Sequence, residues 1–348
     1  MIMSTIEKMI FGKMPDGQEV SLFRMTNEVG SIAEVTNYGG RLVRILVPDK
    51  NGSLTSVIKG FDSLEGYLTD TTFLGAICGR FANRIAKAKF FADGDEYSVT
   101  SNDGENCLHG GAKGFSAQVL DAVIDGESLV LGYLCKDKEE GFPGNLKVEV
   151  TYSWSETNEL SIQITANTDN ATPINITNHA YFNLNGEGQI LDHKLKINAT
   201  RFIPICPDAI PTGEVRFVKD TAFDFIQAKA IGQDINDKDE QLKNGTGYDH
   251  CFVLNKDEFG DLVMAADAFS TESGIGLRVY TTMPGVQFYS GNYLTSVVPG
   301  HEGKLYEARQ AFCLEPEFFP DSPNQSGFPC CILQPKETFQ HTIIFQFY

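Results

Sequence analysis

The feature of this sequence that most restricts its fold is a series of short runs in which apolar and polar residues alternate. A period of two places the apolar side chains on one face of an extended strand and the polar side chains on the other. The runs are rich in β-branched and aromatic residues, which favour strands. They cover residues 19–25, 31–37, 42–48, 146–154, 159–166, 276–282 and 341–347. We therefore expect antiparallel sheets that each turn one face toward a core.

Turn-forming pairs that end in glycine separate many of these runs, as a protein with many strand connections requires. These pairs are Asp16-Gly17, Asn51-Gly52, Asp93-Gly94, Asp103-Gly104 and Asp125-Gly126. Helical periodicity is scarce, and residues 220–232 form a weak candidate for a short helix. No linker, repeat or low-complexity segment interrupts the pattern, so residues 1–348 are predicted to form one domain. The predicted fold class is all-β, a large single-domain antiparallel β-sandwich.

The chain is strongly acidic, with 28 Lys and Arg residues against 46 Asp and Glu residues and a formal net charge of −18. Such a field repels nucleic acid and anionic membrane surfaces, so neither is an expected partner. It disfavours sugar phosphates more weakly, because one local arginine cluster can still bind one. A small neutral ligand fits this charge best.

Several motifs that would indicate export or cofactor binding are missing from the sequence. The first ten residues lack the apolar segment of a secretory signal, and no run reaches the roughly 18 apolar residues of a membrane span, so we expect a cytoplasmic protein. The eight cysteines include no C-x-x-C pair, which favours reduced thiols. The six histidines show no H-x-x-x-H spacing, and no glycine loop has the dinucleotide-binding or Walker A pattern. We expect neither a metal nor a cofactor.

The segment 172–185 is the most informative for function. Read as a strand, it places a row of polar side chains on one face, namely Asn175, Thr177, His179, Tyr181 and Asn183. This row contains no Lys or Glu, although a merely solvated face would normally carry charges. It fits the wall of a cleft that meets hydroxyl groups, and a row of structural polar residues is an equally good alternative.

A second informative segment, 311–324, places Glu315 directly after the apolar residues Phe312 and Leu314. An acid is costly to bury there unless it is paired or functional. Pro316 is expected to end the strand, which would place Glu315 at a strand end, where cleft residues often lie. Alternation puts Glu317 on the same face, but beyond Pro316 its side chain is expected to be freer and less shielded. The alternative is an ordinary edge-strand carboxylate.

Three further regions carry candidate ligand-binding side chains. His109 lies in the glycine-rich loop 106–115, where the backbone can approach a ligand closely. The other candidates are Arg80, Asn83 and Arg84 within 79–86, and Asp249, His250 and Gln287 within 247–250 and 284–289. Each region alone is weak evidence, since an isolated Asp or Gln is usually a solvated surface residue.

Together and in order, these segments resemble the signature motifs of the aldose 1-epimerase (galactose mutarotase) family. The matching segments are 36–40, 79–87, 108–111, 140–146, 177–184, 210–214, 248–250, and 313–315 followed by 319–324. They span nearly the whole chain at the expected separations, which makes the set far more specific than any single motif. Two departures stand out: Pro316 and Glu317 occupy positions where the family usually has Thr-Gln, and Leu120 stands where it often has Trp.

The resemblance implies a β-sandwich with an open cleft and no required cofactor. By position it implies that Glu315 is the catalytic base and His179 the catalytic acid, and that His109 is a second histidine that holds and polarises the sugar. The implied hydroxyl-binding residues are Asn83, Arg84, Asp249 and Gln287, with Tyr181 beside them. The implied substrate is a small neutral monosaccharide such as galactose or glucose, bound by a monomer or homodimer.

Interconversion of the α and β anomers of a hexose needs a base for the C1 hydroxyl proton and an acid for the ring oxygen. Glu315 and His179 are therefore expected to face each other across a cleft of about 5–7 Å. Nearby carboxylates are expected to raise the pKa of His179. Two alternatives stay open: a hexose-6-phosphate 1-epimerase, which should show extra basic residues in the cleft loops, and a non-catalytic sugar-binding protein of the same fold.

Overall fold

The computed structural model describes residues 5–348, and its regular structure is mainly antiparallel β-sheet. Each of the seven alternating runs forms a strand, so the strand prediction is confirmed. The first sheet contains five strands in chain order. They are β1 (Thr5–Lys13), β2 (Glu19–Thr26), β3 (Ile32–Thr36), β4 (Leu42–Pro48) and β5 (Leu54–Ser56).

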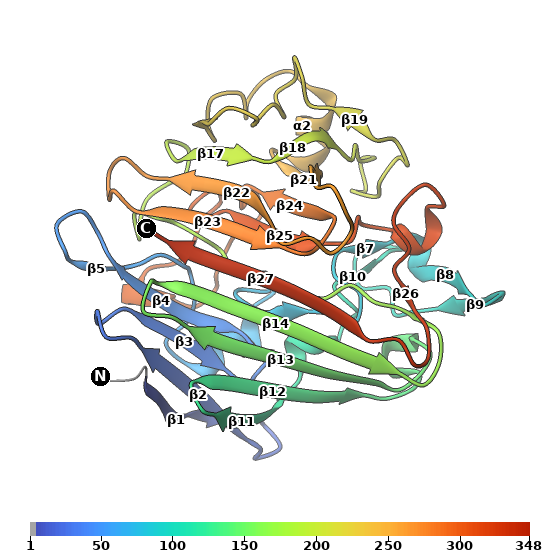
Figure 1. Ribbon diagram of the computed structural model, residues 1–348, viewed down its shortest axis with the longest axis horizontal. Coiled ribbons are helices and arrows are strands. Elements are labelled where there is room, and N and C mark those ends of the chain that lie inside the picture. Colours follow the sequence, from blue (N-terminus) through green and yellow to red (C-terminus); the bar gives the residue numbers. More distant parts are fainter. Residues whose placement is uncertain (1–4) are drawn as a thin grey trace.

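A nine-stranded sheet runs across the molecule (Figure 1). In spatial order its strands are β11 (Asp121–Asp125), β12 (Ser128–Cys135), β13 (Leu146–Trp154), β14 (Glu159–Thr168), β27 (Phe339–Phe347), β23 (Gly276–Thr281), β22 (Val263–Phe269), β17 (Lys194–Ile197) and β20 (Lys229–Ala230). The C-terminal strand β27 pairs with β14 on one side and β23 on the other. Segments far apart in the sequence thereby become neighbours.

The main core lies between the first sheet and the nine-stranded sheet. Phe23 and Ile45 from the first sheet share one buried cluster with Val148 and Ile162 from the nine-stranded sheet. Burying each such side chain stabilises the fold by about 1.5–3 kcal/mol. Along β13 buried residues alternate with more exposed ones, as the sequence predicted. The predicted sandwich of antiparallel sheets is confirmed.

A third sheet carries most of the acidic side chains discussed below. Its strands, in order, are β19 (Arg216–Phe217), β18 (Ala199–Phe202), β21 (Asp249–Leu254), β24 (Gly285–Tyr289) and β25 (Cys313–Glu317). The prediction that Pro316 ends its strand is wrong, because Pro316 pairs with Val286 and Glu317 pairs with Gly285. β25 is the edge strand of this sheet, where a proline is tolerated.

Four two-stranded ribbons accompany the larger sheets within residues 5–348. They are β6 (Ile77–Cys78) with β16 (Thr177–Asn178), β7 (Arg84–Ile85) with β10 (Cys107–Leu108), β8 (Lys89–Ala92) with β9 (Asp95–Ser98), and β15 (Thr172–Pro173) with β26 (Ile332–Leu333). The first two matter for function, because they place His179 and His109 next to the third sheet.

Within residues 5–348 there are two α-helices of six residues each, α1 (Leu64–Thr69) and α2 (Glu240–Gly245). Neither is long and apolar enough to cross a membrane. The weak helix prediction for 220–232 is wrong, because this segment forms turns and the short strand β20. The Thr221 hydroxyl accepts from the Phe223 N–H and the Asp224 carboxylate accepts from the Ile226 N–H, each at 3.1 Å. Such local bonds compete with helix formation.

Candidate active site

A cavity of about 230 Å³ brings together residues from distant parts of the sequence. Seven of the eight predicted site residues line it: Asn83, Arg84, His109, His179, Tyr181, Asp249 and Glu315. The eighth, Gln287, is buried beside the cavity and donates from Nε2 to Oδ1 of Asp249 at 2.7 Å.

The third sheet orients the acidic side chains. Gln287 on β24 lies opposite Cys251 on β21 and opposite Glu315 on β25. Residues directly opposite each other, and residues two apart on a strand, share a face of the sheet. Asp249, Gln287 and Glu315 therefore project to the same side, which is the side of the cavity.

Two residues with left-handed backbone conformations hold the neighbouring loop. Asn83 has φ 63° and His109 has φ 51°, values that are uncommon outside glycine. The His109 N–H donates to the Asn83 carbonyl and the Asn83 N–H donates to Nδ1 of His109, both at 3.1 Å. Because Nδ1 accepts, the neutral ring carries its proton on Nε2 and can donate it to a ligand.

His179 contacts groups on both sides of its ring. Its backbone N–H donates to the Ala76 carbonyl at 2.8 Å, just beyond the β6–β16 ribbon. Nε2 lies 3.6 Å from Oε2 of Glu315, and Nδ1 lies 3.5 Å from Sγ of Cys313. The ring also stacks on Tyr181, with a centroid distance of 5.0 Å. The expected 5–7 Å gap between His179 and Glu315 is wrong, because the two side chains contact each other directly.

Burial controls the ionisation of the acid and the imidazole. It raises the pKa of Glu315 well above its ordinary value, and the charge of Glu317 adds to this shift. Burial lowers the pKa of His179 to about 4 and outweighs the raising effect of Asp70, so the expected net rise is wrong. Burial also lowers the pKa of His109 and raises that of Asp249.

Glu317 is not the free side chain that the sequence suggested. It is fully buried, and its Oε1 accepts a hydrogen bond from Nδ2 of Asn83 at 3.0 Å. Alternation correctly placed it on the same face as Glu315. Glu315, however, lines the cavity, whereas Glu317 is not among the lining residues.

Several other predicted polar residues have structural contacts instead. Asn175 donates to the Ala82 carbonyl at 3.0 Å, and Asn183 donates to the Gln310 carbonyl at 2.8 Å, so the polar row of 172–185 is only partly a cavity wall. Arg80 is buried and donates to the Pro143 carbonyl at 2.6 Å. His250 is buried against Phe223, with a ring-centroid distance of 4.6 Å.

The sequence missed several lining residues, of which Phe73 is the most notable. It has φ 59°, which is rare for a bulky residue, and its ring lies 4.7 Å from that of His109 and 6.2 Å from that of His179. Nothing in its local sequence indicates this conformation. The other missed lining residues are Thr71, Thr72, Leu108, Tyr289 and Tyr293.

Three of the lining residues are of types that can bind a metal ion. Donor atoms of His109, His179 and Glu315 lie within 4.8 Å of one another. In His109, however, Nδ1 already accepts a backbone hydrogen bond and Nε2 carries the proton. Neither nitrogen then offers a free lone pair to a metal, so this trio is arranged for proton donation and acceptance.

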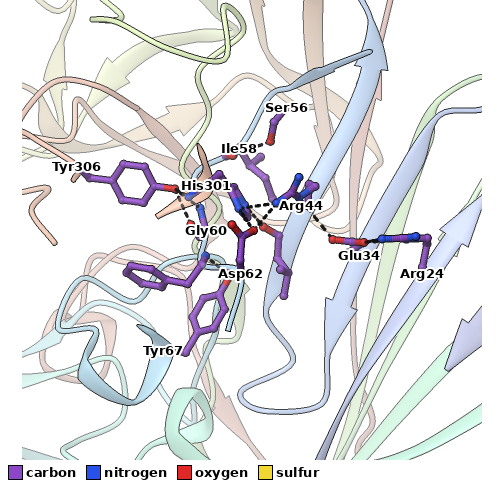
Figure 2. A network of polar contacts seen from close by, with 12 residues as sticks. Arg24, Glu34, Arg44, Ser56, Ile58, Gly60, Asp62, Tyr67, His301 and Tyr306 are labelled. Atoms are coloured by element: carbon purple, nitrogen blue, oxygen red, sulfur yellow. Dashed lines mark hydrogen bonds and ion pairs between the residues drawn. The ribbon is translucent and has the colours of Figure 1, made fainter. Parts of the chain in front are cut away.

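A larger cavity of about 640 Å³ lies among residues 54–59, 185–188 and 301–310 and contains none of the predicted site residues. His301 and Tyr306 line it and belong to the polar network of Figure 2. Nε2 of His301 lies 2.8 Å from the Val43 carbonyl, and the Tyr306 hydroxyl donates to the Gly60 carbonyl at 2.5 Å. Because seven of the eight predicted site residues line the smaller cavity and none lines the larger one, the smaller cavity is the better candidate.

Known proteins are similar to this chain in sequence and fold over nearly their whole length. Residues 21–346 match the family described as aldose 1-epimerase. The chain is 38% identical over 348 residues to the galactose mutarotase of Bos taurus, covering 99% of each chain. It is 38% identical over 337 residues to the aldose 1-epimerase of Escherichia coli strain K12, covering 96% of each. A solved structure, the aldose epimerase homologue from C. elegans, matches with a TM-score of 0.87 at 29% identity, covering 99% of each chain.

Proposed function

This chain belongs to the aldose 1-epimerase family, and from that premise we propose that it interconverts the α and β anomers of a small neutral hexose such as galactose or glucose. The main support is the contact of His179 with Glu315, whose Nε2 and Oε2 atoms lie 3.6 Å apart. The contact lies in a cavity of about 230 Å³, which has room for one monosaccharide.

Glu315 acts as the base and His179 as the acid. Ionised Glu315 removes the C1 hydroxyl proton while the bond from C1 to the ring oxygen breaks, and His179 delivers a proton to that oxygen. Rotation about C1–C2 turns the aldehyde over, and ring closure reverses both transfers. Each positioned proton-transfer group contributes roughly 10²–10⁴ in rate.

The pair needs to hold only one mobile proton. In the ligand-free cavity this proton resides on Glu315, because burial raises the pKa of Glu315 and lowers that of His179. Sugar hydroxyls that donate to Glu315 stabilise its ionised form. Binding therefore shifts the proton toward His179 and prepares both groups for the reaction.

The remaining lining residues hold the sugar. The Nε2–H of His109 donates to a hydroxyl, and Asp249, oriented by Gln287, accepts from one. Asn83, Arg84 and Tyr181 supply further polar contacts around the ring. Positioning of this kind keeps C1 within reach of the acid and the base.

The cavity suits a neutral sugar better than a sugar phosphate. Among the described residues that line it, Arg84 is the one cation, and its Nε already donates to Asp103 at 2.8 Å. Asp249 and Glu315 line the same cavity, and a bound phosphate would oppose the ionisation of Glu315 that the reaction requires. A hexose-6-phosphate 1-epimerase is therefore not favoured. A cytoplasmic location remains a prediction from the sequence.

Polarimetry tests this function directly. Freshly dissolved α-D-galactose and α-D-glucose are expected to reach their equilibrium rotation much faster with the protein than without it, whereas glucose 6-phosphate gains little. A Glu315→Gln variant that still binds sugar but no longer accelerates the change separates an enzyme from a sugar-binding protein. No acceleration by the unmodified protein with either sugar would overturn the proposed function.

A further inference from the structure

The proposed reaction leaves one buried acid of the site unused. Glu317 lies two residues after Glu315 on β25 and projects to the same face of the sheet. Both residues are buried: Glu317 is 0% exposed and Glu315 is 2% exposed. The Oε2 atoms of both have no hydrogen-bond partner among residues 5–348. Two neighbouring carboxyl groups are therefore held out of water with incomplete hydrogen bonding.

The charges around this pair do not balance. Asp249 adds a third buried carboxyl group, and Arg84, the nearby cation, is itself paired with Asp103. Burial and the nearby glutamates raise the pKa of the neighbouring thiols, so the thiols stay neutral, and a neutral thiol supplies no positive charge to balance the pair. These thiols are Cys78, Cys251 and Cys313. Burial also keeps His179 neutral by lowering its pKa. Like charges at short range in a weakly polar environment repel strongly, so burial and proximity both oppose the loss of both protons from the pair.

Another buried glutamate shows how this chain compensates a charge elsewhere. Glu34 is 4% exposed, and it forms ion pairs with Arg24 at 2.6 Å and with Arg44 at 3.6 Å (Figure 2). Glu317 receives the neutral amide of Asn83 instead of a cation. That hydrogen bond favours the ionised form of Glu317 over that of Glu315, which has no such donor.

We propose that Glu315 and Glu317 share one negative charge at neutral pH, and that Glu317, which holds most of it in the ligand-free site, is a positioning residue that makes Glu315 a stronger base. The proposal rests on the proposed function for its catalytic consequence. A charged neighbour increases the affinity of Glu315 for the C1 hydroxyl proton. The proton that Glu315 accepts or releases moves only between Glu315, the sugar and His179, and Glu317 exchanges none with the substrate.

The pH dependence of kcat/KM in a Glu317→Gln variant tests this role. Glutamine keeps the shape of the side chain but cannot ionise, so Glu315 loses its proton at a lower pH. The acidic limb of the profile is expected to move down by about one pH unit or more, while kcat at pH 7 falls less than about tenfold. The matched control is Glu34→Gln, which removes a buried carboxylate outside the cavity and leaves the limb in place. An acidic limb of Glu317→Gln that coincides with that of the unmodified protein would overturn the inference.

Infrared spectroscopy tests whether Glu315 and Glu317 share one negative charge, and it needs no catalytic turnover. It therefore tests the proposal even if the Glu317→Gln variant does not fold. The unmodified protein is expected to show the carbonyl stretch of a neutral carboxylic acid at pH 7. This band should disappear in Glu315→Gln, because Glu317 then ionises alone, and should persist in Asp249→Asn. Absence of the band in the unmodified protein at pH 7 would contradict the inference. Failure of the polarimetric assay, by contrast, would contradict the proposed function. It would not affect the spectroscopic test, which measures the shared charge without any reaction.

Discussion

Nε2 of His179 lies 3.6 Å from Oε2 of Glu315, so the two side chains approach the cavity from adjacent positions. The C1 hydroxyl and the ring oxygen of a pyranose are bonded to the same carbon. An adjacent acid and base can therefore reach both oxygens from one side of the sugar, and a wide gap between them is unnecessary.

Replacing Glu315 by Gln should lower kcat by at least about 100-fold with little change in KM. Glutamine keeps the shape of the side chain and its contact with the sugar, but it cannot accept the C1 hydroxyl proton. Polarimetry or a coupled assay at several sugar concentrations gives both constants. Glu317→Gln serves as the comparison, with an expected loss of less than about tenfold. A nearly normal Glu315→Gln combined with an inactive Glu317→Gln would mean that the base has been assigned to the wrong glutamate.

Activity should survive exhaustive dialysis against a chelator. The mechanism moves only protons, and the hydrogen bond from the Asn83 N–H to Nδ1 of His109 leaves that ring without a lone pair for a metal. The measurement is the rate of mutarotation before and after dialysis, with a mock-dialysed sample as the control. Loss of activity that added Zn²⁺ or Mg²⁺ restores would refute this prediction.

Removing the thiol of Cys313 should lower kcat several-fold in Cys313→Ala. Sγ of Cys313 lies 3.5 Å from Nδ1 of His179, and this contact should help to fix the ring that we propose as the proton donor. Cys313→Ser keeps a small polar group at the same place and should recover most of the activity. Equal activities in the alanine and serine variants would show that the contact does not orient His179.

The sheets could be predicted from the sequence because strand periodicity is local. Residues 146–154 alternate over nine positions, and β13 has the same bounds. The ribbons that build the site could not be predicted in this way. Each strand of the β7–β10 ribbon has two residues, which is too short to show a period, and the ribbon depends on partners distant in sequence. The neighbourhood of His109 and Arg84 is therefore a product of tertiary structure.

The placement of some site residues could likewise be predicted from local alternation, and the placement of others could not. Asp249 and His250 are adjacent in a strand, so they point to opposite faces, and only Asp249 lines the cavity. Glu317 is buried and accepts a hydrogen bond from Asn83, which lies far away in the sequence, and no local pattern at Pro316 indicates either feature. The left-handed conformation of Phe73 likewise has no sequence signal.

Two buried histidines outside the cavity, His250 and His341, should make the fold less stable in acid. Burial lowers the pKa of His250 and of His341 to about 3, compared with an ordinary value of 6.5. The folded state therefore keeps both rings neutral at pH 5, whereas the unfolded chain binds a proton on each. A group with a lowered folded pKa stabilises the protein above its unfolded pKa and loses that contribution as the pH falls. At pH 5 each ring should reduce the free energy of unfolding by about 2 kcal/mol relative to pH 7.

Urea unfolding of His341→Gln at pH 7 and pH 5 measures this effect. Glutamine does not titrate in this range, so the variant should lose about 2 kcal/mol less than the unmodified protein between the two pH values. The difference between the two proteins isolates the histidine, because the raised pKa values of Glu315 and Glu317 change stability in the opposite direction and act equally in both. Any packing defect caused by the substitution appears at both pH values and cancels in the comparison. If the pH dependence of the two proteins is the same, His341 is already protonated in the folded state at pH 5, and burial does not lower its pKa as far as we infer.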